Sequence, residues 1–262
     1  MTPRSIPRVF PSRPLGLNVQ AFSTTRFGGV SQAPYGLHGG QSGGLNLASH
    51  VGDALDRVVE NRRRLAELLP SEPHWLQQVH GITVYEVTSS DHAQAVADAA
   101  ITTQADVVLA ILTADCLPVL LADRHGKIVG AAHAGWRGLA GGVLESVVRA
   151  MRDRVPQADL CAWIGPAIGA RAYEVGDEVR EALIAGDALH EEAFSRSHLP
   201  GKWFVNLAMI AQMRLQRHGV GLIECSEACT ASDFERFWSY RRDGISGRIA
   251  TCIWLQRGLS SI

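Results

Sequence analysis

The sequence predicts an α+β fold in which helices and mixed β-sheets pack in layers within a single domain over residues 1–262. Three observations lead to this prediction. Apolar residues make up 46% of the 262 residues and charged residues 19%, so the chain can bury a sizeable core. Strand-like and helix-like segments alternate without a regular β–α–β rhythm, and no G-x-G-x-x-G turn follows a strand, which argues against a dinucleotide-binding fold. No linker rich in proline, serine or charge divides the chain.

Nine short segments have the pattern of β-strands. The first alternates apolar and polar residues, as a strand with one buried face does. Several later segments are runs of branched apolar residues, which is typical of strands buried on both faces. The second and third predicted strands meet near His80. The predicted strands are residues 18–23, 75–79, 83–87, 107–112, 117–122, 127–132, 162–164, 220–224 and 249–255.

Four segments have apolar residues at helical spacing. Asp53 and Asn206 are placed to act as N-caps, and Pro70 and Gly219 lie just beyond two of the expected ends. The predicted helices are residues 54–69, 139–151, 177–185 and 207–218. Two stretches are expected to be irregular: residues 1–15, which contain four prolines, and the glycine-rich residues 36–44.

Charge and cysteine content exclude several classes of function. Lysine and arginine total 25 against 26 acidic residues, a balance that argues against binding to nucleic acids or anionic membranes. Five cysteines, an odd number in a long chain, indicate reduced thiols of a cytoplasmic protein. The N-terminal prolines interrupt any signal peptide, and the richest apolar stretch, residues 107–122, is too short and too polar to span a bilayer.

His80, Cys116 and His133 share a context in which a side chain can leave the core. Each lies at the end or edge of an apolar strand, beside a small or turn residue. Two imidazoles and a thiolate suit zinc, and three protein ligands leave a fourth position open for water or substrate. Taken singly, however, each residue also fits an ordinary core position. On sequence position alone, both interpretations remain open.

The same three residues allow two other chemistries. Two histidines and a cysteine are also the ligands of a blue-copper site, so copper is a second possible metal. A multicopper oxidase also needs paired His-X-His motifs, and none of the ten histidines is so paired. Alternatively, Cys116 is the nucleophile and His133 the base of a hydrolase that cleaves a small peptide-like amide.

A glycine-rich turn follows the predicted strand that ends before His133. Residues 134–138 bring backbone N–H groups to the start of a helix, and Arg137 adds a fork of donors, an arrangement suited to phosphate. A tight turn with a solvated arginine is the simpler alternative. Asp115 adjoins Cys116, but alternation along a strand would turn the two side chains to opposite faces. The proton carrier of a deamination is therefore left unassigned.

The motifs resemble the signature blocks of the YfiH/laccase-domain family, whose members are known as purine nucleoside phosphorylases or polyphenol oxidases. The blocks occur in order across nearly the whole chain. The main ones are Gln-Val-His-Gly at 78–81, Thr-Ala-Asp-Cys-Leu-Pro at 113–118, His-Ala-Gly-Trp-Arg-Gly at 133–138 and Phe-Trp-Ser-Tyr-Arg-Arg-Asp-Gly at 237–244. Shorter matches lie at residues 23–31, 46–47, 52–53, 60–62, 164–166 and 229–230.

The resemblance implies a four-layer α/β/β/α fold, also similar to a group of cysteine hydrolases, and a catalytic zinc on His80, Cys116 and His133. It implies phosphorolysis of adenosine, inosine and S-methyl-5′-thioadenosine, together with deamination of adenosine. Purine nucleoside and phosphate are then the partners. Arginines and an asparagine within or beside the matched blocks become candidate substrate or phosphate ligands: Arg26, Asn46, Arg137 and Arg242.

Three departures from the family pattern affect the expected substrate choice. The loop between Val30 and Asn46 is longer and richer in glycine, Trp238 stands in place of a phenylalanine, and Ser246 in place of a threonine. None of these positions is a predicted metal ligand. Because the loop could change access to the site, we expect the choice of nucleoside to be the property that differs most.

Overall fold

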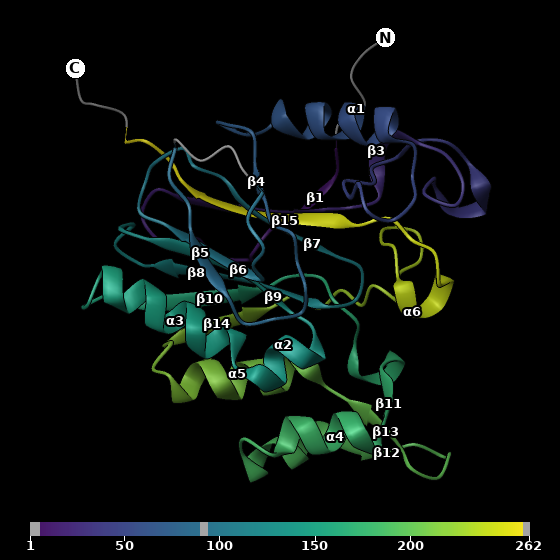
Figure 1. The fold of residues 1–262 in the computed structure, drawn as a ribbon, viewed down its shortest axis with the longest axis vertical. Helices are drawn as coiled ribbons and strands as arrows, with labels where there is room; N and C mark the ends of the chain where they lie inside the picture. Colours follow the sequence, from purple (N-terminus) through teal and green to yellow (C-terminus); the bar gives the residue numbers. More distant parts are fainter. Residues whose placement is uncertain (1–5, 90–93, 259–262) are drawn as a thin grey trace.

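Two mixed β-sheets lie face to face between helices in the computed structural model of the chain, which describes residues 6–89 and 94–258 (Figure 1). Both sheets combine parallel and antiparallel pairs. The first sheet has the order β1 (Arg8–Val9), β2 (Val19–Thr24), β15 (Ile249–Leu255), β7 (Leu109–Thr113) and β4 (His74–Trp75). The second has the order β14 (Leu222–Cys225), β10 (Leu160–Ile164), β8 (Leu117–Asp123), β9 (Val129–Ala134), β6 (Ala99–Thr102) and β5 (Val84–Glu86).

Helices cover the outer face of each sheet. In Figure 1, α1 (Leu55–Ala66) lies over the first sheet, while α3 (Val143–Arg154) and α5 (Leu207–Arg217) lie under the second. The order of layers is therefore α/β/β/α, and the predicted α+β fold with mixed sheets is confirmed. Below these layers in the same view lies a smaller unit of α4 (Asp177–Ile184) with a third sheet of β11 (Glu174–Gly176), β13 (Lys202–Val205) and β12 (Phe194–Arg196).

Alternation along the central strands separates the cores. In β8, Val119 and Leu121 belong to the core beneath the second sheet, whereas Leu120 belongs to the core between the two sheets. In β7, Ile111 faces the core between the sheets and Ala110 faces α1. Both faces of these strands are buried, which explains why their sequences are continuous apolar runs and not alternating ones.

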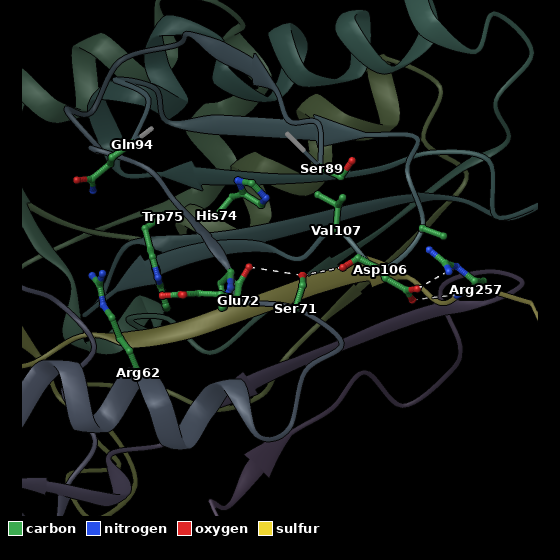
Figure 2. A pocket seen from close by; sticks show the side chains of 12 residues that line it. Arg62, Ser71, Glu72, His74, Trp75, Ser89, Gln94, Asp106, Val107 and Arg257 are labelled. Atoms are coloured by element: carbon green, nitrogen blue, oxygen red, sulfur yellow. Dashed lines mark hydrogen bonds and ion pairs between the residues drawn. The ribbon is translucent and has the colours of Figure 1, made fainter. Parts of the chain in front are cut away.

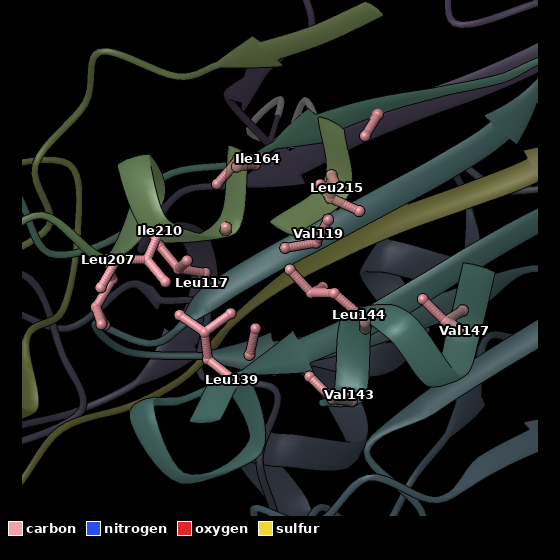
Figure 3. Packing of buried hydrophobic residues seen from close by; sticks show 14 of the residues in the cluster. Leu117, Val119, Leu139, Val143, Leu144, Val147, Ile164, Leu207, Ile210 and Leu215 are labelled. Atoms are coloured by element: carbon pink, nitrogen blue, oxygen red, sulfur yellow. The ribbon is translucent and has the colours of Figure 1, made fainter. Parts of the chain in front are cut away.

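The core beneath the second sheet anchors the strands that carry the functional residues. Leu144 and Val147 of α3 and Ile210 of α5 pack toward the apolar side chains of β8 and β10 (Figure 3). Leu139, Val143 and Val147 are completely buried. This packing fixes the positions of β8 and β9, because their apolar side chains are held from below by two helices.

The predicted helices are found, most with bounds that differ by one to three residues. The segment expected as one helix from residue 139 is two helices, α2 (Trp136–Gly141) and α3, because Gly142 takes a left-handed conformation at φ +100°. The first helix ends at Ala66 and not at Leu69. Its predicted cap is wrong: the carboxylate of Asp53 binds Ser31 and Asn46. Asn206 does cap α5, accepting the N–H of Met209 at 3.1 Å.

One predicted strand is mostly absent. Of the predicted residues 75–79, only Trp75 lies in a strand, the two-residue β4 that it forms with His74. The strands β4 and β5 lie in different sheets. Gln78 explains the early end of the strand. Its side-chain amide donates to the carbonyl oxygen of Leu112 and accepts the N–H of Leu112, both at 2.9 Å. The side chain thus makes the two hydrogen bonds to β7 that the backbone of a longer β4 would make. The chain can then turn away from β7 toward the second sheet.

Several elements were not expected from the sequence. The short α6 (Tyr240–Asp243), β3 (Phe27–Ser31), β6 and the strands of the third sheet are present. Residues 8 and 9, within the stretch expected to be irregular, form β1 and pair with β2. Three short 3₁₀ turns lie at His38–Gly40, Ala170–Ala172 and Ala188–Ala193. Across the described residues, we find no helix with the length and apolar character needed to cross a membrane.

Candidate metal centre

His80, Cys116 and His133 converge at one end of the second sheet. Cys116 lies just before β8 and His133 lies near the end of β9, and the antiparallel register sets Pro118 opposite His133. His80 comes from the loop between β4 and β5. One potential ligand atom from each residue lies within 4.8 Å of the others. The expected grouping of these three side chains is therefore present in the structure.

The three side chains differ in exposure. His133 is buried, with 4% of its surface accessible, Cys116 is partly buried and His80 is exposed. The rings of the two histidines meet edge to face, with 4.7 Å between centroids and 68° between planes. A small molecule can therefore reach the cluster from the side of His80, while the side of His133 is closed by protein.

The neighbours of the two histidines affect them differently. Burial opposes a charge on His133, but hydrogen bonds with Asp98 and Cys116 raise the pKa of His133 to about 9. The distance from His133 Nδ1 to Asp98 Oδ1 is 2.8 Å. Burial and the neighbouring His133 lower the pKa of His80. A cation bound at this cluster would take the place of the proton that His133 otherwise holds.

Glycine residues after β9 make room for the cluster. A Cβ atom at Gly135 would lie 2.6 Å from His80 Nδ1 and 3.1 Å from Cys116 Sγ. At Gly138, a Cβ would lie 3.0 Å from the carbonyl oxygen of Gly81. The turn that begins α2 thus packs directly against the loop that carries His80. This close approach explains the glycines of the 133–138 motif without any ligand.

Asp115 bonds away from the cluster, but strand alternation is not the reason, because residues 114–116 form a bend between β7 and β8. Its backbone is left-handed, at φ +93°. Its carboxylate accepts hydrogen bonds from Thr230 Oγ1 at 2.7 Å, Ser239 Oγ at 3.0 Å and the N–H of Arg241 at 2.7 Å. Asp115 therefore anchors the segment before and within α6 and is not free to carry a proton for a substrate.

The four candidate substrate ligands are not all brought together. Arg137 is exposed at the start of α2, and its guanidinium carbon lies 4.3 Å from the centroid of the Trp136 ring. The other three have partners within the protein. Arg26 donates to the carbonyl oxygens of Phe234 and Gly36, Asn46 binds Ala48, Asp53 and Arg248, and Arg242 binds Thr230, Ala231, Phe237 and Asp243.

Two residues near the cluster were not singled out from the sequence. Burial lowers the pKa of Arg248, while Cys116 and Asp115 act to raise it, which places this cation within electrostatic reach of the cluster. Burial raises the pKa of Tyr173 to about 12, with a further contribution from Cys116. The guanidinium carbon of Arg241 lies 4.8 Å from the Tyr173 ring centroid. Arg248 lies two residues after Ser246, which stands in place of the family's threonine, and this proximity was a usable signal for Arg248; Tyr173 had none.

A pocket of about 560 Å³ opens elsewhere, beside β4 (Figure 2). None of the three clustered residues lines it. Figure 2 shows Arg62 beside Trp75 at one end and the Asp106–Arg257 ion pair at the other. Arg62 lies 4.3 Å from the centroid of the Trp75 ring. This pocket is therefore separate from the cluster of His80, Cys116 and His133.

Fold and site together define a layered α+β protein with a His-Cys-His candidate metal centre. The chain belongs to the family described as multi-copper polyphenol oxidoreductase laccase, whose model matches residues 20–256.

Named relatives support this assignment. A purine nucleoside phosphorylase of Pseudomonas aeruginosa is 48% identical over 94% of this chain and 97% of its own. The purine nucleoside phosphorylase YfiH of Escherichia coli is 47% identical over 94% and 98%.

Solved structures agree with the fold. A crystal structure of a Neisseria meningitidis protein has a TM-score of 0.87 at 40% identity, covering 95% of this chain and 99% of that one. YlmD of Geobacillus stearothermophilus has a TM-score of 0.84 at 33% identity, covering 96% and 100%.

Proposed function

We propose that this chain is a cytoplasmic, zinc-dependent purine nucleoside phosphorylase that also deaminates adenosine. Its substrates are adenosine, inosine and S-methyl-5′-thioadenosine, with phosphate as the second substrate. The single observation that carries the proposal is the approach of ligand atoms of His80, Cys116 and His133 to within 4.8 Å of one another at an accessible edge. The names of the relatives supply the reaction class.

The donor set favours zinc over copper as the resident metal. Two imidazoles and a thiolate, with room for a fourth ligand, are typical of catalytic zinc. The chain contains no His-X-His pair of the kind that a multicopper cluster uses. Zinc bound there would supply Lewis-acid chemistry and activate water for deamination.

The chain's own cations supply the attraction for phosphate. Arg137 is exposed, and both Arg137 and Arg248 contribute to lowering the pKa of His80. The helix α2 has only six residues, so its dipole adds little and the two side chains provide most of the positive charge. A phosphate held by Arg137 can form charge-assisted hydrogen bonds while the nucleoside lies over His80.

Product analysis tests the proposal. The zinc-loaded protein is incubated with adenosine in the presence and absence of phosphate, and the products are separated by chromatography. We expect adenine and ribose 1-phosphate only with phosphate, and inosine in both cases. The triple variant His80→Ala/Cys116→Ala/His133→Ala serves as the control for a contaminating phosphorylase. Absence of turnover of any of the three nucleosides would contradict the proposal.

One observation favours a second candidate function, a cysteine hydrolase that cleaves a small peptide-like amide. Cys116 interacts with the imidazole of His133, whose other nitrogen lies 2.8 Å from Asp98. A cysteine, a histidine and a carboxylate in this order resemble the relay of a nucleophilic enzyme. Alkylation separates the two functions: protection of Cys116 by zinc, lost on adding a chelator, favours a ligand. Amide cleavage by the zinc-free protein favours a nucleophile.

A further inference from the structure

Asp98, a residue that the sequence did not mark, is the most heavily bonded side chain at the metal centre. It is fully buried, just before β6. Its Oδ1 accepts the N–H of His80 at 2.9 Å and contacts His133 Nδ1 at 2.8 Å. Its Oδ2 accepts the N–H groups of Val79 at 3.1 Å and Gly81 at 2.6 Å. One carboxylate thus contacts the two segments that carry both histidines.

Strand pairing explains why Asp98 meets His133. The antiparallel register of β6 and β9 sets Ala99 opposite Ala132, so Asp98 comes beside His133 one step further along. The N–H of His133 also donates to the carbonyl oxygen of Asp98 at 2.7 Å. Backbone and side chain of Asp98 therefore hold the same histidine, which fixes the position of its ring within the sheet.

The contact selects one nitrogen of His133 for a metal. A carboxylate that accepts from Nδ1 keeps a proton on that nitrogen, so Nε2 is the ring nitrogen that gives up its proton when a metal binds. Hydrogen bonds of this kind between a carboxylate and a ligand histidine orient the ring and increase its basicity. His133 therefore offers Nε2, and no other atom of its ring, to the cluster.

The second oxygen of Asp98 acts on the loop that carries His80. His80 has a left-handed backbone, at φ +61°, which is unfavourable for a residue with a side chain. Three successive N–H groups, those of Val79, His80 and Gly81, point to the one carboxylate. A concave row of N–H groups around an anion holds such a turn in place. The exposed His80 is thereby kept beside the buried His133.

We propose that Asp98 is the positioning residue of this metal centre, which selects the Nε2 atom of His133 and holds the His80 loop in its left-handed turn. The inference rests on the metal centre of the proposed function but not on the nucleoside reaction. Asp98 does not reach a substrate, because His133 and the loop of residues 79–81 lie between it and the open side. Its effect is therefore exerted through the two histidines.

The zinc affinity of Asp98→Asn, measured by competition with a chromogenic chelator, tests whether Asp98 positions the two histidines. The amide keeps the size of the carboxylate but replaces one acceptor oxygen with a donor, so it cannot receive all four hydrogen bonds. We expect zinc binding to weaken by roughly 10- to 100-fold. Asp123→Asn is the matched control, since Asp123 is also fully buried and accepts the N–H groups of Lys127 and Asp159 far from the cluster. Equal zinc affinity in Asp98→Asn and the wild type would overturn the proposal.

A measurement on the wild type covers the case in which Asp98→Asn does not fold. Long-range ¹H–¹⁵N NMR of the zinc-loaded protein, with ring signals assigned through His133→Gln, identifies which nitrogen of His133 carries the proton. We expect a protonated Nδ1 and a metal-bound Nε2; coordination through Nδ1 would overturn the proposal. Neither experiment measures turnover. If the wild type binds zinc through His133 Nε2 and Asp98→Asn weakens that binding, but the wild type cleaves no nucleoside, the result counts against the phosphorylase and supports the role of Asp98.

Discussion

Gly135 packs against His80 so closely that a Cβ atom added there would lie 2.6 Å from His80 Nδ1. Real Cβ atoms do not approach a neighbour this closely, so either the ring of His80 or the turn at Gly135 has to move. We expect Gly135→Ala to displace His80, to lower zinc affinity at least 10-fold and to abolish most nucleoside cleavage. Isothermal titration with zinc and thermal unfolding of the zinc-free variant separate this effect from loss of the fold.

Gly221 provides the control for that substitution. An added Cβ there meets nothing within 4 Å, and its φ is not positive. Gly221→Ala should leave zinc affinity and turnover unchanged. Wild-type zinc affinity in Gly135→Ala would show that the close packing beside His80 does not matter for the metal.

Arg137 is predicted to act on phosphate and not on zinc. Arg137→Ala removes a charge-assisted contact of about 1.5 to 3 kcal/mol, a loss of roughly 10- to 150-fold. The loss should appear as a higher KM for phosphate in phosphorolysis, while deamination, which uses no phosphate, changes little. Arg149→Ala, an exposed arginine of α3, is the control. Equal losses in both reactions would make Arg137 a nucleoside contact or a support of the His133 turn.

Asp115 is predicted to hold the segment of residues 229–243 against the site. Asparagine tolerates the left-handed backbone of residue 115 as aspartate does. Asp115→Asn therefore changes only the side chain, and it removes an acceptor from Thr230, Ser239 or Arg241. The free energy of unfolding should fall by about 1 to 3 kcal/mol, since a buried donor is left without a partner. Urea unfolding measures this loss, and hydrogen exchange should quicken within 229–243. Asp159→Asn, at an exposed ion pair with Arg124, should do neither.

Metal removal should affect activity before it affects the fold. The three candidate ligands lie at one end of the second sheet, whereas the apolar cores lie between the sheets and between each sheet and its helices. We therefore expect a chelator to remove zinc and nucleoside cleavage while the far-UV circular dichroism remains unchanged. Adding zinc should restore turnover. Unfolding of the protein on chelation would instead indicate a structural metal.

The long central strands, and the residues that the structure groups as His80, Cys116 and His133, could be predicted because their signals are local. Continuous apolar runs such as residues 107–112 identify strands buried on both faces, and Cys116 and His133 lie at the edge of such runs. His80 was found through the same reasoning although the strand predicted before it is mostly absent. The strand at Ala99–Thr102 was missed because two of its four residues are alanine, which has no preference for strands. Asp98 was missed with it, since only the pairing of β6 with β9 brings it to His133.

Side-chain direction in loops could not be predicted, because tertiary partners decide it. Arg26 and Arg242 lie in matched motifs, yet their guanidinium groups donate to backbone carbonyl oxygens of the 36 and 230–237 regions. Asn46 is fully buried and bonded to Asp53. Asp53 itself looked like a helix cap in the sequence, but its carboxylate is occupied by Ser31 and Asn46. Their roles in substrate binding stay predictions.

The stoichiometry of zinc in the wild type and in His80→Ala/Cys116→Ala/His133→Ala tests the central claim most directly. Both proteins are purified in the same way, loaded with zinc, freed of excess metal and analysed by mass spectrometry of the element. Cys225→Ser, which changes a partly buried thiol outside the cluster, is the control. We predict one zinc per chain in the wild type and the control, and none in the triple variant. A triple variant that retains one zinc per chain would contradict the assignment of the metal centre to these residues.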